Sequence, residues 1–218
     1  KRCSYCIIPK IRGRFRSVPM QELLNEAKRL ASEGVKELVL VAQETTLYGK
    51  DLTGEKQLPL LLHKLCKIEG IEWIRLLYCY PEEITDELIK VIKTEEKVCN
   101  YIDMPIQHSE NRILQRMGRR TSREDLVAVI KKLRKEIPDI TIRTTLITGF
   151  PGESQEDHEG LMNFVEECQF DRLGVFTYSP EEDTLAATFE DQIDEEVKEE
   201  RRDELMSLQQ EISYEHTQ

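Results

Sequence analysis

Long apolar runs are missing from this chain of 218 residues. No stretch approaches the roughly 18 to 20 apolar residues that a membrane span needs, and the basic residues 1–16 contain no apolar signal core. The sequence also lacks a low-complexity segment, an internal repeat and a recognisable linker. We therefore expect a cytoplasmic protein with no membrane partner and with one domain covering residues 1–218.

The chain has fewer bases than acids, 31 Lys and Arg against 42 Asp and Glu, so the formal net charge is −11. A surplus of acid disfavours a whole-surface nucleic-acid binder and favours a basic protein partner. The bases are unevenly placed: Lys1, Arg2, Lys10, Arg12, Arg14 and Arg16 all precede the first acid, Glu22. These bases could form a local basic site for an anionic ligand. The acid-rich run 190–204 is expected to be a solvated helix face.

Cysteine is also infrequent, with six residues of which only Cys3 and Cys6 form a close pair. The others are scattered singly among apolar residues and are expected in the core: Cys66, Cys79, Cys99 and Cys168. Without a secretory signal, a C-x-x-C pair indicates metal or redox chemistry rather than a disulfide framework.

Several uses of the Cys3 and Cys6 pair remain open from spacing alone. It could be a redox dithiol, half of a zinc site, two ligands of an iron–sulfur cluster, or an accidental surface pair. The thioredoxin context fails because Ile-Ile-Pro at 7–9 follows instead of a helix opening, and zinc would need a second pair nearby.

Apolar periodicity predicts helices alternating with strands along the whole chain. Helices are expected at 19–33, 58–68, 85–93, 111–117, 123–137, 154–168 and 195–215. Strands are expected at 35–42, 73–78, 101–104, 141–148 and 173–178. Capping boxes are expected at Ser122 with Asp125 and at Ser154 with Asp157.

This alternation predicts an α/β fold with a parallel sheet, either doubly wound or part of a (β/α) barrel. Polar or Gly-Pro clusters follow each expected strand, at 43–45, 80–82, 107–109, 149–153 and 179–182. The carboxyl ends of parallel strands are where such folds place their sites.

The segment 1–9, with Arg12, Gly13, Arg16 and Ser17, resembles the C-x-x-x-C-x-x-C signature of radical S-adenosylmethionine (radical SAM) methylthiotransferases. The resemblance continues at 43–49, 73–75, 101–108 and 143–153. It implies a partial (β/α) barrel whose first strand precedes this chain, so that the five expected strands are its second to sixth.

The resemblance also implies the cofactors. Cys3, Cys6 and a cysteine two residues before Lys1 would bind three irons of a 4Fe-4S cluster, and the fourth iron would hold S-adenosylmethionine. An electron from the cluster then cleaves the sulfonium to methionine and a 5'-deoxyadenosyl radical.

Further site residues follow from the same resemblance. It implies cofactor-binding roles for Tyr5, Gln43, Gln107, Arg143, Gly149 and Glu153. Tyr5 would lie near the adenine or only pack the loop, and Gly149 would allow close backbone approach to the adenosine or only form a tight turn. Arg143 would reach the cofactor carboxylate, although strand alternation could turn it to solvent.

His108 could contact substrate or cap the following helix. The others lack ligand spacing and are expected on the surface or in the core: His63, His158 and His216.

Two substrate classes occur in the family, an adenosine of tRNA and an aspartate of the twelfth small-subunit ribosomal protein. The loop Gln-His-Ser-Glu at 107–110 and the acidic loop 178–184 resemble the protein-modifying branch. The acidic balance agrees, because ribosomal proteins are basic. The resemblance thus implies replacement of a β-carbon C–H of that aspartate by a methylthio group.

Family members carry a second 4Fe-4S cluster in an N-terminal domain, which serves sulfur delivery, and a C-terminal TRAM domain. Neither is in this chain, so the resemblance implies a radical SAM core that lacks full activity by itself and that needs a reductant protein. The non-enzymatic alternative is an acidic scaffold domain that binds a basic partner.

Overall fold

The computed structural model describes residues 3–216, which form two compact units. The first unit comprises the described residues of three segments, 3–14, 105–130 and 142–216. The second comprises Phe15–Met104 and Lys131–Thr141. Each unit is a parallel α/β arrangement with its own buried core.

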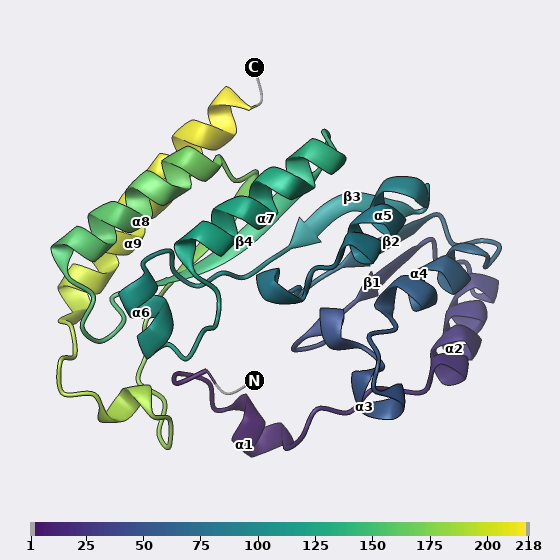
Figure 1. Ribbon diagram of the computed structural model, residues 1–218, viewed down its shortest axis with the longest axis horizontal. Helices are drawn as coiled ribbons and strands as arrows, with labels where there is room; N and C mark the ends of the chain where they lie inside the picture. The colour runs from purple at the N-terminus through teal and green to yellow at the C-terminus, as the bar shows by residue number, and fades with distance from the viewer. Residues whose placement is uncertain (1–2, 217–218) are drawn as a thin grey trace. The chain divides into compact units, whose positions relative to one another are not determined.

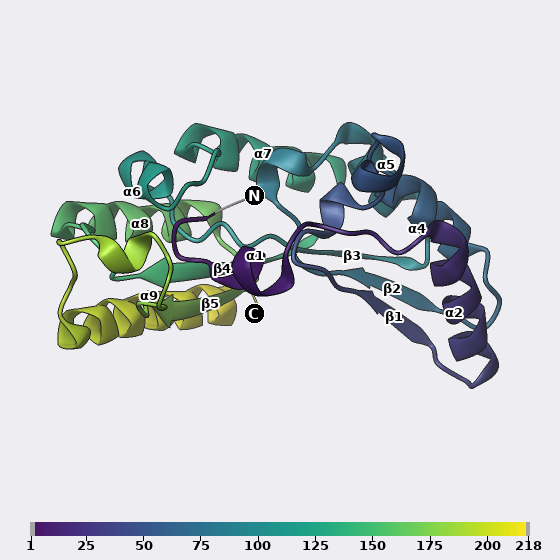
Figure 2. The same ribbon diagram turned by 90° about the horizontal axis from the view of Figure 1, so that it is seen from below.

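The second unit is built on three parallel strands, β1 (Glu37–Leu40), β2 (Trp73–Leu76) and β3 (Val98–Asp103). Helices α4 (Leu58–Cys66) and α5 (Asp86–Thr94) cover one face of this sheet, and α2 (Met20–Ser32) contacts α4 (Figure 2). Leu62, Ile74 and Ile92 are almost fully buried between these layers. Because successive strand side chains alternate in direction, the opposite sheet face keeps Val39 about half exposed.

Short helical turns shape the loops of the second unit. They are η1 (Thr45–Leu47), α3 (Lys50–Thr53) and η2 (Pro81–Glu83). Thr45 donates its backbone N–H to Tyr78 O at 3.0 Å and its hydroxyl to Leu77 O at 2.6 Å. The loop after β1 is thereby fixed to the end of β2.

The first unit pairs β4 (Thr141–Thr148) with β5 (Arg172–Thr177) in parallel, with Thr144 opposite Leu173. Helices α8 (Gln155–Cys168) and α9 (Glu195–Glu215) lie side by side, and α9 also packs along β5 (Figure 1). The remaining helical segments of this unit are α1 (Ile8–Arg12), α6 (Asn111–Arg116) and η3 (Ala186–Thr188), and α7 (Arg123–Glu136) begins in it.

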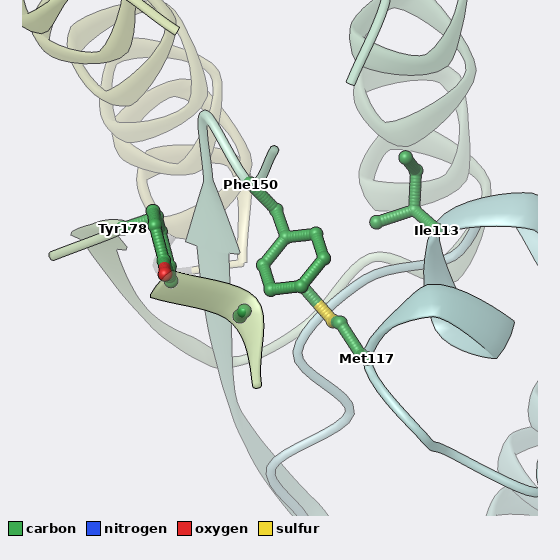
Figure 3. Close-up of a cluster of buried hydrophobic side chains, with 5 residues drawn as sticks. Ile113, Met117, Phe150 and Tyr178 are labelled. Atoms are coloured by element: carbon green, nitrogen blue, oxygen red, sulfur yellow. The ribbon is translucent and has the colours of Figure 1, made fainter. Parts of the chain in front are cut away.

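An aromatic cluster closes the core of the first unit at the carboxyl ends of β4 and β5. It contains Ile113, Met117, Phe150, Tyr178 and Ala186, and Figure 3 shows the Phe150 ring between Tyr178 and Met117. The Phe150 and Tyr178 rings meet edge to face with centroids 5.2 Å apart, an arrangement that aromatic quadrupoles favour. Because Phe150 follows β4 and Tyr178 follows β5, the cluster packs the two loops after these strands onto the core.

The α/β prediction with parallel strands alternating with helices is confirmed, with five strands in the described chain. The bounds of β4 and α9 agree with expectation, and the capping box of α8 is present. The strand expected at 35–42 is shorter, Glu37–Leu40, because the chain after it turns into η1. Whether an earlier strand precedes these five, and whether residues 1–218 are one radical SAM core, stay predictions.

Two expectations about individual side chains need correction. Cys79 and Cys168 are buried, but Cys66 and Cys99 are only half-buried, because they lie at element ends rather than inside the layers. The run 190–204 is not a uniformly solvated face, since Lys198 and Arg201 are buried against the ends of the first unit's strands. None of the helices in residues 3–216 has the length and apolar content of a membrane span.

Candidate cofactor site

The cysteine pair lies in a tight turn at the start of the described chain. Cys6 donates its backbone N–H to Cys3 O at 3.1 Å, which brings the two cysteines onto one short loop. Contrary to the expectation that no helix opens after the cysteine pair, the next residues form the short helix α1, because Pro9 in its first turn is well suited to a helix start. Both cysteines are half-buried and are not joined in a disulfide, so the loop presents two free thiols together.

Ser4 fixes this cysteine loop to the end of α6. Its backbone N–H donates to Met117 O at 2.9 Å, and its hydroxyl donates to Arg116 O at 2.8 Å. The last carbonyls of a helix have no partner inside the helix, so Ser4 satisfies groups that would otherwise be left open. Ala186 in η3 completes the attachment by donating its N–H to Ser4 O at 2.9 Å.

Two thiols alone do not make a metal site. Within residues 3–216 no group of three histidine, cysteine or acidic side chains could hold a metal ion. Structural zinc takes four protein ligands, and a cluster that leaves one iron open takes three cysteines. The donor set of Cys3 and Cys6 therefore fits part of a thiolate-ligated centre, and the ligands that would complete such a centre stay a prediction.

Tyr5, between the two cysteines, rests against the aromatic cluster. Its ring meets Phe150 nearly perpendicularly, with centroids 6.3 Å apart and an interplanar angle of 81°. Phe150 belongs to the loop 149–153, which joins β4 to α8. The packing alternative for Tyr5 is therefore present in the structure, and its contact with an adenine stays a prediction.

Gly149 begins the loop 149–153 in the left-handed region, with φ at 67°. A Cβ built on Gly149 would overlap Cγ and Cβ of Lys198. Lys198 is buried, and its Nζ donates to Tyr178 O at 3.0 Å and to Glu195 Oε2 at 3.0 Å. Glycine is needed here both for the backbone turn and for the lysine stem that crosses it.

Glu153 ends the loop and folds its carboxylate back underneath it. Oε2 accepts from Gly149 N at 3.0 Å and lies 3.3 Å from His108 Nε2, while Oε1 accepts from Arg201 Nη1 at 2.9 Å. The side chain is fully buried. Burial by itself would raise the pKa of Glu153, but the hydrogen bonds from His108 and Gly149 and the charge of Arg201 lower the pKa below its ordinary value. Glu153 is thus a buried carboxylate anion that organises the loop.

His108 connects this network to the segment after β3. Its Nδ1 accepts the backbone N–H of Glu110 at 3.0 Å, so Nε2 carries the hydrogen that faces Glu153. Glu110 is the N-cap residue of α6, and His108 therefore acts at the start of that helix. His108 thus bonds to the residue that precedes the helix rather than to its first turn, and both its capping role and a contact with substrate stay predictions.

Gln107 lies at the same edge with an unusual backbone. Its φ is 72°, and it forms a parallel bridge with Leu146, donating its N–H to Thr145 O at 2.9 Å and accepting from Ile147 N at 2.8 Å. A positive φ on a non-glycine residue is uncommon and occurs often at functional sites. The side-chain Oε1 is buried without a hydrogen-bond partner, which leaves a polar atom that a ligand could satisfy.

Arg143 lies further back along β4, and Gln43 belongs to the second unit. Arg143 is near the beginning of β4, roughly 16 Å along the strand from Thr148 at about 3.3 Å per residue. It belongs to the half-exposed face of β4, and its guanidinium lies beside Gly174. Gln43 is in the second unit, where it is exposed after β1, and the neighbouring Glu44 caps η1 by accepting from Thr46 N at 3.2 Å.

The first unit therefore gathers several of the expected site residues around one loop. Gly149 and Glu153 belong to the loop itself, Tyr5 reaches it through Phe150, and the segment of Gln107 reaches it through His108. Sequence reasoning missed Ser4, Lys198 and Arg201 as supports of this site. The only signal for the last two was the presence of bases inside an acid-rich run, whose burial depends on the tertiary fold.

Comparison with known proteins gives a consistent result. A family model described as the radical SAM superfamily matches residues 1–165. The chain is 64% identical over 218 residues to the ribosomal protein uS12 methylthiotransferase RimO of Lachnoclostridium phytofermentans, covering 100% of this chain and 50% of that protein. It is 60% identical over 213 residues to the RimO of Clostridium perfringens, covering 98% of this chain and 48% of that protein. The chain thus spans about half the length of these relatives.

Solved structures agree at the level of fold. The radical S-adenosylmethionine methyltransferase TsrM from Kitasatospora setae, with cobalamin and a [4Fe-4S] cluster bound, has a TM-score of 0.66 at 18% identity, covering 81% of this chain and 34% of that chain. Streptococcus suis SuiB bound to S-adenosylmethionine has a TM-score of 0.65 at 13% identity, covering 94% of this chain and 44% of that chain.

Proposed function

This chain belongs to the radical SAM superfamily, and we propose that it is the catalytic core of a methylthiotransferase that modifies an aspartate of a basic small-subunit ribosomal protein. The identity of 64% over the whole chain to a relative named for modifying uS12 supports this substrate. The observation that carries the chemistry is the cysteine loop, which presents Cys3 and Cys6 beside Tyr5 and the loop 149–153.

Cys3 and Cys6 are proposed as two ligands of a 4Fe-4S cluster, with a third cysteine two residues before Lys1. When bound, the cluster and S-adenosylmethionine would supply the radical that removes a hydrogen from the β-carbon of the aspartate. The contribution of this chain is to hold the two thiols on one rigid turn, because Ser4 attaches that turn to α6 and η3.

The cofactor-binding residues are proposed from the same family pattern. Gln107 has the strongest physical support, since its buried Oε1 lacks a partner and its backbone is held in a strained region. Tyr5, Gly149 and Glu153 would shape the pocket for the adenosine. The roles of Arg143, at the carboxylate of S-adenosylmethionine, and of Gln43, after β1, are proposed from the family pattern alone.

Parts of the reaction depend on groups outside this chain. We propose that sulfur comes from a second 4Fe-4S cluster in an N-terminal domain and that a reductant protein supplies electrons. A ribosomal-protein substrate would place the reaction in the cytoplasm. The surplus of acid, with a net charge of −11, suits a basic protein better than tRNA.

The test uses the chain extended upstream through the third cysteine, loaded anaerobically with iron and sulfide and reduced in the presence of S-adenosylmethionine. We expect 5'-deoxyadenosine as product, and we expect Cys3→Ala and Cys6→Ala to abolish it together with most of the bound iron. Cys66→Ala is the matched control, because Cys66 is also half-buried but lies on α4. This variant should keep both iron and product.

A folded wild-type protein with no cluster and no cleavage would contradict the radical SAM chemistry and favour an acidic scaffold. The substrate is tested separately with the full-length enzyme. Addition of a methylthio group to the ribosomal protein but not to isolated tRNA is expected, and the reverse result would move the function to the tRNA branch.

A further inference from the structure

Three consecutive carbonyl groups of the loop 149–153 each accept a hydrogen bond from a different arginine. Arg116 Nε donates to Pro151 O at 3.1 Å, and Arg112 Nη2 donates to Gly152 O at 2.7 Å. Arg201 Nη1 donates to Glu153 O at 3.1 Å. We call Arg112, Arg116 and Arg201 the arginine clamp.

Each member of the clamp is itself held by a carboxylate. Arg112 pairs with Asp157, Arg116 pairs with Asp191, and Arg201 pairs with Glu153. A guanidinium has several donors in a fixed plane, so it can bind a carboxylate and a carbonyl at the same time. The clamp is therefore oriented before any ligand arrives.

The loop needs such external partners because of its backbone. Gly149 and Gly152 have positive φ values of 67° and 82°, which prevents a regular ladder of backbone hydrogen bonds. The N–H groups are satisfied internally or nearby: Gly149 N donates to Glu153 Oε2, Gly152 N to Asp191 O, and Glu153 N to Phe150 O. Without the arginines these carbonyls would lose their protein partners, and the loss is most costly for Glu153 O, whose hydrogen bond with Arg201 is buried.

Helix α6 connects the clamp to the cysteine loop. The side chain of Arg116 holds Pro151 O, while the backbone oxygen of the same residue accepts the hydroxyl of Ser4. The thiol-bearing loop and the loop 149–153 thus share one support, and α9 supplies the second through Arg201.

We propose that Arg112, Arg116 and Arg201 are positioning residues that preorganise the loop 149–153 for the adenosine of S-adenosylmethionine. The inference rests on the proposed function, in which this loop meets that cofactor. Their side chains bond to the loop backbone, and in the described part of the chain they make no hydrogen bond with Cys3 or Cys6. Loss of a clamp residue should raise the dissociation constant of S-adenosylmethionine, because the free energy of binding is then reduced by the cost of ordering the loop.

The experiment compares Arg112→Gln and Arg201→Gln with Arg202→Gln in the full-length, cluster-loaded enzyme. Arg202 follows Arg201 directly in α9. It is partly exposed, and among the described residues it pairs only with the neighbouring Asp203. We expect the dissociation constant of S-adenosylmethionine to rise about 10-fold in both clamp variants and to stay unchanged in Arg202→Gln. Iron content and the resonance spectrum of the reduced cluster without S-adenosylmethionine should match the wild type in all three.

Conservative replacement provides a second readout. Arg112→Lys keeps a charged donor that can reach one acceptor, so it should bind S-adenosylmethionine more tightly than Arg112→Gln. The Arg112 side chain is 52% exposed, so its variants are expected to fold even where Arg201→Gln does not.

The outcomes separate the two proposals. A folded, cluster-loaded wild-type enzyme that does not bind S-adenosylmethionine would contradict the proposed function. Normal binding by the wild type, with Arg112→Gln and Arg201→Gln indistinguishable from Arg202→Gln, would overturn the clamp alone. Loss of iron from Arg112→Gln in proportion to its loss of affinity would also overturn it, because the effect would then act on the cysteine loop.

Discussion

Gly149 and Gly54 illustrate how two glycines with similar backbones can have different physical roles. Both lie in the left-handed region, with φ at 67° and 84°. A Cβ on Gly54 would meet no atom within 4 Å, whereas a Cβ on Gly149 would overlap the stem of Lys198. A side chain would strain the left-handed backbone at both positions, but only at Gly149 would its Cβ also clash with another residue.

We therefore expect Gly54→Ala to lower the free energy of unfolding by about 1–2 kcal/mol, the usual cost of a left-handed backbone for a residue with a Cβ. Gly149→Ala should lower it by more, about 3 kcal/mol, because overpacking adds to the backbone strain. Urea unfolding of the two variants beside the wild type measures both values. Equal losses would show that Lys198 yields to the added methyl group and that only the backbone matters.

At the scale of elements, the capping box of α8 is a local device that the sequence predicted. The Ser154 hydroxyl accepts from Asp157 N at 3.2 Å, and Asp157 Oδ2 accepts from Ser154 N at 2.7 Å. Ser154→Ala removes one half of this box and should lower the free energy of unfolding by about 1 kcal/mol. Chemical denaturation monitored by circular dichroism gives the value.

Ser207→Ala is the matched control for this prediction. Ser207 is exposed in the interior of α9, where alanine is the better helix former, so this variant should be as stable as the wild type or slightly more stable. A Ser154→Ala variant no less stable than Ser207→Ala would mean that water replaces the cap without loss.

Element positions were predictable to the extent that their signals are local. Thr141–Thr148 and Glu195–Glu215 agree with expectation because alternation and helical periodicity extend over the whole segment. The start of β3 at Val98 was missed, since the expected strand began only at residue 101, and the pairing of Val98 with Ile74 that extends it is a contact between distant segments. The turns η1 and η2 lack any periodic signal.

For the whole molecule, net charge is the property most relevant to the proposed substrate. With a net charge of −11, the chain should attract a basic protein. Added salt should weaken this attraction, because the Debye length falls from about 10 Å at 0.1 M to about 3 Å at 1 M. We expect KM for the ribosomal protein to rise at least several-fold between about 0.1 and 0.5 M salt in the full-length enzyme, because association weakens as charges are screened. Steady-state kinetics at several salt concentrations measures this change.

The internal control is cleavage of S-adenosylmethionine without protein substrate. The proposed adenosine loop is built from buried or partly buried contacts such as Glu153 with Arg201, which salt screens less than exposed pairs. The rate of S-adenosylmethionine cleavage without protein substrate should therefore change little over the same range of salt concentration. Parallel losses in both reactions would point to general destabilisation rather than to substrate attraction.

The sequence by itself determined the α/β class, most helices and strands, and the family, because periodicity and the C-x-x-C loop are written in neighbouring residues. Only the tertiary structure decided how the candidate site is supported. Arg201 reaches Glu153 across 48 residues and Arg116 reaches Pro151 across 35, and nothing in the local composition distinguishes these arginines from solvated ones. Such pairings arise when packing removes water from a charged side chain and the nearest carboxylate or carbonyl must replace it.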